Sequence, residues 1–200
     1  MPYTKPVIRE PYYDCPVWIE SDVTRNEVTF LSSESSVHDV ELFLLHLFGY
    51  NSIDVSHTIE RSFEELFALE EVAILGGVAF LKDEDTVILP SCCCGLEDWE
   101  TINESIERRQ SPWLGHDPSP GIAYHDDYLT VWSDDSQIEN NEVLNIRFTY
   151  PEMKESLDRT RRDILGFIEK PLYQWLEVRD KEIAINMKEK MHTWFLKEKR

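Results

Sequence analysis

The sequence predicts an α+β fold: a mostly antiparallel sheet of about five to six strands flanked by helices, with a C-terminal helical pair. Some stretches repeat apolar residues at helical spacing, whereas others alternate apolar and polar residues or form short apolar runs typical of strands. Hydrophobic residues make up 42% of the 200-residue chain, which is enough for a substantial core. We interpret residues 1–150 as an acidic α+β body and residues 151–200 as a helical segment packed on or extending from it, one domain overall.

In the first half of the body, strands and helices follow one another. Residues 17–32 predict two strands around a polar turn, and residues 35–50 predict a helix that opens with serine caps. A second amphipathic helix is expected within residues 56–71. Residues 72–90 are rich in apolar and β-branched residues and predict a hairpin of buried strands, with its turn at the acidic residues 83–85.

The second half of the body continues this pattern. Residues 96–109 place apolar side chains on one helical face, and residues 112–121 form a loop rich in proline and glycine. Residues 122–135 predict a hairpin that turns near Asp126 and Asp127. Residues 142–150 alternate apolar and polar side chains, as a half-buried strand does.

From Pro151 onward the chain is expected to be helical, with a kink or break at Pro171. The second helix of this pair carries a long apolar stripe that reaches Trp194. We expect this stripe to pack across the body. Its length also allows the alternative that it pairs with a second copy of the chain.

The net charge of −19 is unevenly distributed, because residues 1–150 carry 29 acidic and 8 basic side chains and residues 151–200 carry 10 and 12. A body with a net charge of −21 repels nucleic acid backbones and attracts basic proteins, so we expect a basic protein partner and no direct nucleic acid binding. The N-terminus lacks a signal-peptide pattern, and no apolar run reaches the roughly 18 residues of a membrane span. We therefore expect a cytoplasmic protein without membrane contact, whose cysteines stay mostly reduced.

Three consecutive cysteines, Cys92, Cys93 and Cys94, are the most unusual local feature. Metal ligands must converge on one ion, whereas neighbouring residues of a regular helix or strand point in different directions. The chain contains neither CxxC nor HxxxH, and Cys15, His116 or His125 would join these cysteines only by tertiary convergence. We accordingly predict no metal site and no cofactor, and interpret the cysteines as small apolar residues at a turn.

The sharper alternative is a cysteine nucleophile. Cys94 precedes Gly95 at an expected helix start, where the helix dipole would favour a thiolate. His116 or His125 would serve as the base, oriented by Asp117, Asp126 or Asp127. No cysteine-hydrolase signature surrounds these cysteines, so this remains the second hypothesis.

The candidate partner-binding residues are Trp113, His116 and Asp117 on the proline-rich loop, together with Asp126 and Asp127. A stiffened loop loses little entropy on binding, and tryptophan is favoured at the centre of interfaces. The competing interpretations are that Trp113 anchors the loop to the core and that the two aspartates only solvate a turn.

Nucleotide-binding and serine-hydrolase motifs are absent, since the sequence contains no GxGxxG, GxxxxGK[ST] or GxSxG. The leading hypothesis is a non-enzymatic acidic protein-binding module that engages a basic protein partner. In size, acidity and fold class it resembles bacterial toxin-neutralising (immunity) proteins, and this resemblance of type implies an inhibitor. The alternatives are the small cytosolic cysteine enzyme described above and an acidic mimic of nucleic acid.

Overall fold

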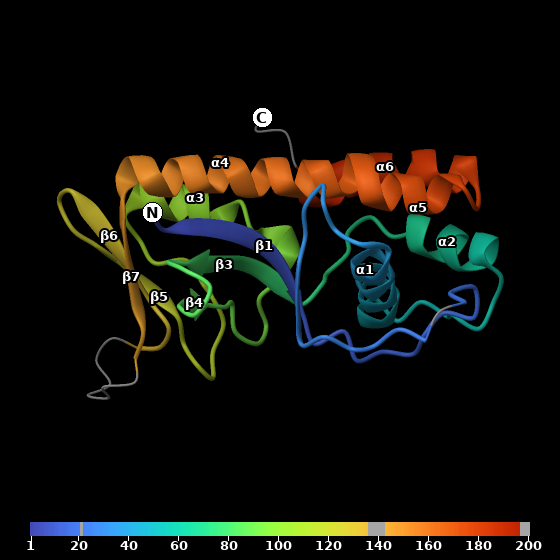
Figure 1. Cartoon of the computed structure of the whole chain (residues 1–200), viewed down its shortest axis with the longest axis horizontal. Helices are drawn as coiled ribbons and strands as arrows, with labels where there is room; N and C mark the ends of the chain where they lie inside the picture. The colour runs from blue at the N-terminus through green and yellow to red at the C-terminus, as the bar shows by residue number, and fades with distance from the viewer. Residues whose placement is uncertain (21, 136–142, 197–200) are drawn as a thin grey trace.

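The computed structural model describes residues 1–20, 22–135 and 143–196, and over these residues the chain has an α+β fold (Figure 1). Within that part, the strands form two antiparallel sheets, ordered β2-β1-β3-β4 and β5-β6-β7. The bounds of the strands are β1 Tyr3–Arg9, β2 Val28–Phe30, β3 Gly76–Leu81, β4 Val87–Ile88, β5 Gly121–Tyr124, β6 Tyr128–Trp132 and β7 Asn145–Thr149. The predicted α+β class is confirmed, whereas the prediction of one sheet of five to six strands is not, because the described strands divide four and three.

The N-terminal strand β1 is the element that the sequence pattern did not predict. It pairs along its length with β3, from Tyr3 opposite Leu81 to Ile8 opposite Gly76. Of the two strands expected within residues 17–32, the described part of that range contains only β2, and residue 21 lies outside the described residues. The centre of the four-stranded sheet is thus built from segments about 70 residues apart in the chain.

The two predicted hairpins are present. Strands β3 and β4 pair with Phe80 opposite Ile88, and the acidic turn is closed by Asp83 Oδ1, which accepts hydrogen bonds from the backbone N–H groups of Asp85 and Thr86 at 3.2 and 2.7 Å. Strands β5 and β6 form the second hairpin, and β7 continues that sheet as expected.

The helices are α1 Val37–Tyr50, α2 Ile59–Phe67, α3 Thr101–Arg108, α4 Tyr150–Phe167, α5 Tyr173–Glu177 and α6 Lys181–Phe195. A short 3₁₀ helix, η1 (Leu96–Asp98), precedes α3, and a π-helical segment, η2 (Ile168–Leu172), contains Pro171. Capping boxes begin two of the helices: Ser36 and Asp39 cap α1, and Thr149 and Glu152 cap α4. The expected second C-terminal helix is divided, because Asp180 caps a new helix, α6.

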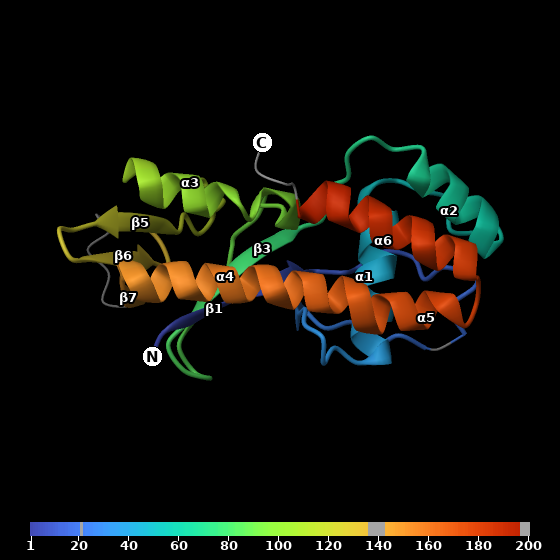
Figure 2. The same ribbon diagram turned by 90° about the horizontal axis from the view of Figure 1, so that it is seen from above.

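The C-terminal helices pack on the rest of the chain. Helix α4 extends along the molecule over β1 and beside β7 (Figures 1 and 2). The buried hydroxyls of Thr4 on β1 and Thr160 on α4 are 2.8 Å apart. The apolar stripe of α6, which includes Met187 and Met191, is buried within the chain. The stripe therefore packs within the chain, as expected, rather than being left exposed for a second copy.

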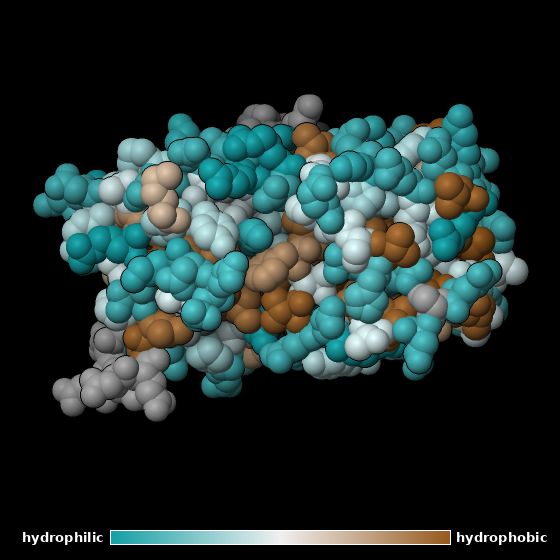
Figure 3. Space-filling view, viewed as in Figure 1, coloured by the Kyte–Doolittle hydropathy of each residue, from teal (hydrophilic) through white to brown (hydrophobic). Residues whose placement is uncertain are grey.

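The two sheets share one hydrophobic core, in which Phe80 of β3 and Phe148 of β7 meet edge to face with ring centroids 6.2 Å apart. A second aromatic contact, between Phe43 of α1 and Phe167 of α4, has a centroid distance of 5.0 Å. The face seen in Figure 3 is mostly hydrophilic, with small apolar patches. Among the described helices, none combines the length and apolarity needed to cross a bilayer.

Candidate functional site

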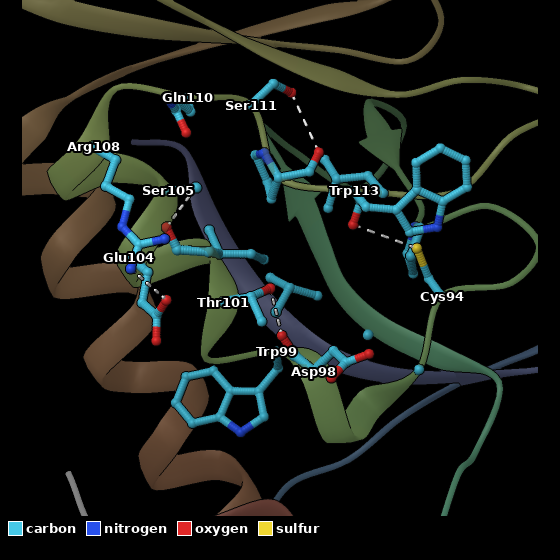
Figure 4. A pocket seen from close by; sticks show the side chains of 17 residues that line it. Cys94, Asp98, Trp99, Thr101, Glu104, Ser105, Arg108, Gln110, Ser111 and Trp113 are labelled. Atoms are coloured by element: carbon cyan, nitrogen blue, oxygen red, sulfur yellow. Dashed lines mark hydrogen bonds and ion pairs between the residues drawn. The ribbon is translucent and has the colours of Figure 1, made fainter. Parts of the chain in front are cut away.

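A cavity of about 350 Å³ opens between η1, α3 and residues 110–114 (Figure 4). Its apolar wall includes the buried side chains of Trp99, Ile102 and Leu114. The position of the Trp99 side chain is fixed by α6, because its Nε1–H donates a 2.7 Å hydrogen bond to the carbonyl oxygen of Phe195 on that helix. The apolar face predicted within residues 96–109 thus supplies part of the apolar wall of the cavity.

Charged side chains of α3 and η1 lie at the rim of this cavity. Asp98 and Glu104 are exposed, and Glu104 pairs with Arg108 one turn along α3 at 3.4 Å. Exposed pairs of this kind are worth only about 0.3–0.5 kcal/mol, so Glu104 is readily available to another cation. Figure 4 shows Glu104 and Arg108 across the cavity from Trp113 and Cys94.

Trp113 is 64% exposed and stands at the mouth of the cavity. The expectation that it anchors the loop to the core does not fit this exposure. The loop is held by other groups: the N–H of Ser91 donates to Leu114 O at 2.9 Å, and Ser91 Oγ donates to His116 O at 2.7 Å. These bonds fix the backbone of the loop, while the exposed indole ring contacts the ring of His116 at a centroid distance of 5.9 Å.

Cys94 lies in the cavity wall and is buried. Burial, with smaller contributions from Asp98 and other neighbours, raises the pKa of its thiol to about 12. This direction is opposite to the one predicted from the position of Cys94 before an expected helix start. The helix after Gly95 is only the three-residue η1, and α3 does not begin until Thr101, so no long helix dipole acts on the thiol.

The imidazole of His116 lies beside Cys92 rather than Cys94. Cys92 Sγ is 3.1 Å from His116 Nδ1 and donates to the carbonyl oxygen of His116 at 2.7 Å. Cys93, which follows, is exposed and has a φ of +66°, in the left-handed region. Partial desolvation and the neighbouring Cys92 raise the pKa of the Cys93 thiol.

The remaining candidate residues are divided between two loops. Asp117 is exposed next to His116 on the proline-rich loop. His125, Asp126 and Asp127 belong to the turn between β5 and β6, where His125 stacks on the ring of Tyr128 at a centroid distance of 4.4 Å. The four-residue strand β5, about 13 Å long, separates this turn from the proline-rich loop.

Three residues of the site were not singled out by the sequence analysis: Asp98, Glu104 and Cys92 as the partner of His116. The two carboxylates come from different elements, Asp98 from η1 and Glu104 from α3, and helical periodicity does not place residues six apart on one face. The pairing of Cys92 with His116 joins residues 24 positions apart, and no local pattern carries it.

Comparisons with protein-family models, with curated proteins and with solved structures give no match to this chain. The chemistry of the site therefore carries the functional conclusion.

Proposed function

We propose that this chain is a non-enzymatic, acidic protein-binding module of the inhibitor or immunity type, which engages a basic protein partner at the Trp113 loop and the adjoining cavity. The observation that carries the proposal is the position of Trp113. It is a largely exposed aromatic side chain at the mouth of a cavity whose rim bears Asp98 and Glu104. Exposed tryptophans next to pockets are typical anchors of protein interfaces.

The cavity suits an arginine or lysine side chain of the partner. Its volume of about 350 Å³ is at the small end of the range for binding pockets. The apolar wall formed by Ile102 and Leu114 would accept the aliphatic stem, and the carboxylates of the rim would pair with the charged head. The indole face of Trp113 would add a cation–π contact of about 0.5–2 kcal/mol.

The charge of the body supports the same partner. Several of its few cations are already engaged within the chain: Arg9 pairs with Glu10 and Glu27, and Arg61 pairs with Glu64. The carboxylates in excess therefore determine the field that an approaching protein meets, and such a field accelerates association with a basic surface.

The direct test is capture of partners from the source cell at low salt, with the wild-type protein and two variants in parallel. Trp113→Ala removes the proposed anchor. Tyr12→Ala is the matched control, because Tyr12 is a similarly exposed aromatic side chain (59%) on another segment. A basic protein retained by wild type and Tyr12→Ala but lost with Trp113→Ala, and released as salt rises, supports the proposal.

With the captured protein purified, binding kinetics separate the contribution of the Trp113 loop from that of the turn between β5 and β6, which carries the other candidate partner-binding residues. Substituting both Asp126 and Asp127 by Asn is expected to slow association and weaken its salt dependence, while dissociation stays nearly unchanged. Trp113→Ala is expected to accelerate dissociation. A partner whose binding ignores Trp113 and ionic strength would contradict the proposal. A DNA-binding partner that duplex DNA displaces would replace it with the nucleic-acid-mimic hypothesis.

The cysteine-enzyme hypothesis has less support, because the thiol it requires lies in the cavity wall with its pKa raised to about 12. His125 stacks on Tyr128, and His116 contacts Cys92, so neither imidazole is placed as a base for Cys94.

A further inference from the structure

The loop that follows β4 and the proline-rich loop bring two thiols and an imidazole to one point on the surface. The ligand atoms of Cys92, Cys93 and His116 all lie within 4.8 Å of one another. In residues 1–20, 22–135 and 143–196, no other group of three or more cysteine, histidine or acidic side chains has this closeness.

The backbone holds these residues together independently of any ion. Cys92 and His116 form an antiparallel bridge, and the Ser91 hydrogen bonds to Leu114 and His116 flank it on the same pair of segments. Gly115 permits this close approach, because a Cβ at that position would lie 2.6 Å from the carbonyl oxygen of Cys92. Two independent stretches of chain are thus fixed with their ligand atoms adjacent.

The left-handed conformation of Cys93 explains how two neighbouring cysteines can both face the imidazole of His116. The directional argument against shared ligation holds for regular helices and strands, and Cys93, with a φ of +66°, lies in neither. Cys94 does take a separate direction, into the cavity wall, where its Sγ contacts the carbonyl oxygen of Trp113 at 3.8 Å. Two of the three thiols therefore remain on the side of His116.

We propose that Cys92, Cys93 and His116 bind a Zn²⁺ ion, with a fourth coordination position open to solvent. Thiolate and imidazole are the ligands that zinc prefers, and three protein ligands with one open position are a common zinc arrangement. Tetrahedral bonds of about 2.3 Å to sulfur and 2.0–2.1 Å to nitrogen require S···S and S···N separations of about 3.8 and 3.6 Å. Only one nitrogen of His116 can bind the ion, and the observed Cys92 Sγ distances are 3.1 Å to Nδ1 and 4.0 Å to Nε2. A small shift of the imidazole therefore brings either nitrogen to the required separation.

Zinc binding would displace the thiol protons of both cysteines into solvent, since the metal binds thiolates. Cys92 would then lose its hydrogen bond to the carbonyl oxygen of His116. That oxygen keeps a partner, because Ser91 Oγ also donates to it at 2.7 Å. The net charge of −19 further favours the approach of a dication over that of an anion.

The test is titration of Zn²⁺ into the reduced full-length protein in competition with a chromophoric chelator. One equivalent is expected to bind, and Cys92→Ser, Cys93→Ser and His116→Ala are each expected to weaken the affinity by at least about tenfold. Cys15→Ser is the matched control, because Cys15 is a partly exposed cysteine outside the cluster, and it is expected to retain wild-type affinity. Absence of binding, or binding that the three cluster substitutions leave unchanged, would overturn the proposal.

Two measurements on the wild-type protein avoid dependence on how well the variants fold. Co²⁺ in place of Zn²⁺ is expected to give thiolate-to-cobalt charge-transfer absorption and the intense visible bands of a tetrahedral site. Zn²⁺ is also expected to protect Cys93 from alkylation while leaving the labelling of Cys15 unchanged, as measured by peptide mass mapping. Equal labelling of Cys93 with and without Zn²⁺ would count against the site.

The proposal of a zinc site and the proposal of a partner surface can be refuted independently of each other. Partner capture repeated with a metal chelator tests the acidic surface without zinc, and zinc titration of the isolated protein needs no partner.

Discussion

His46 makes the stability of this fold depend on pH in a way that one substitution isolates. Its side chain, on α1, is fully buried, and its Nε2 accepts a 3.1 Å hydrogen bond from the backbone N–H of Leu75. That nitrogen must therefore be unprotonated, and burial lowers the pKa of His46 from 6.5 to about 4. Protonation would place an N–H opposite the Leu75 N–H and bury an uncompensated charge.

The sign follows from proton binding in the two states. Below pH 6.5 the unfolded chain is protonated at His46, whereas the native chain is not protonated there until about pH 4. Unfolding between these pH values therefore takes up a proton, and the free energy of unfolding decreases as the pH is lowered. The two pKa values give a loss of about 2 kcal/mol between pH 7 and pH 5, and about 3 kcal/mol by pH 4. Above pH 6.5 this contribution is fully present.

The perturbation is His46→Gln, whose side-chain oxygen retains an acceptor for the Leu75 N–H but does not titrate. Urea unfolding followed by tryptophan fluorescence at pH 7 and pH 5 gives the free energy of unfolding of each protein. The variant is expected to be less stable at pH 7, because it loses the ring contacts with Tyr13 and Tyr50, yet to lose about 2 kcal/mol less than wild type on acidification.

His125→Gln is the matched control, because it makes the same substitution at a histidine that is exposed at a turn. Exposed carboxylates such as Glu152, whose pKa is lowered by hydrogen bonds from Thr149, also destabilise the fold in acid, but they do so equally in all three proteins. If wild type and His46→Gln lose stability in parallel between pH 7 and pH 5, the assignment of the neutral, desolvated imidazole is wrong.

Two further predictions concern cysteine reactivity and a buried hydroxyl pair. Cys93 is expected to be alkylated in the native protein and Cys94 only after unfolding, by peptide mass mapping in metal-free buffer; native labelling of Cys94 would revive the cysteine-enzyme hypothesis. Thr4→Val is expected to destabilise the fold by about 1–3 kcal/mol, because it leaves the Thr160 hydroxyl buried without this partner, and the double change with Thr160→Val should recover part of that loss in urea unfolding. A double variant as unstable as the sum of the single variants would show that the hydroxyls do not interact.

Local patterns predicted the elements whose signals lie within a few residues of one another. The capping serine before α1, the acidic turn between β3 and β4, and the alternation along β7 are all of this kind. Strand β1 was missed because Pro6 interrupts its pattern and because its partner β3 lies far along the chain. The division into two sheets was missed for the same reason, since pairing between distant strands leaves no periodicity in the sequence.

The candidate site likewise contains features that local sequence predicts and a contact that it does not predict. The proline-rich loop and its exposed tryptophan were identified from composition, whereas the contact between Cys92 and His116 depends on two backbone conformations that composition does not specify. Cys93 adopts a positive φ although it is not glycine, which is uncommon. The prediction that neighbouring cysteines point in different directions assumed a regular helix or strand, so it does not apply to Cys93. Which of the three cysteines is exposed and which is buried therefore could not be predicted from their positions in the sequence.

Gly115 joins the two proposed surfaces, because it lies between Trp113 and His116 and touches the Cys92 segment. Its φ is +98°, and a Cβ there would also lie 2.7 Å from Ser91, so Gly115→Ala should displace the loop from that segment. Zinc affinity and Trp113-dependent capture are then expected to fall together. Gly121→Ala is the control, because its Cβ would meet only Ser111 Oγ at 3.4 Å. A Gly115→Ala protein that stays folded and retains both activities would show that neither surface depends on this loop geometry.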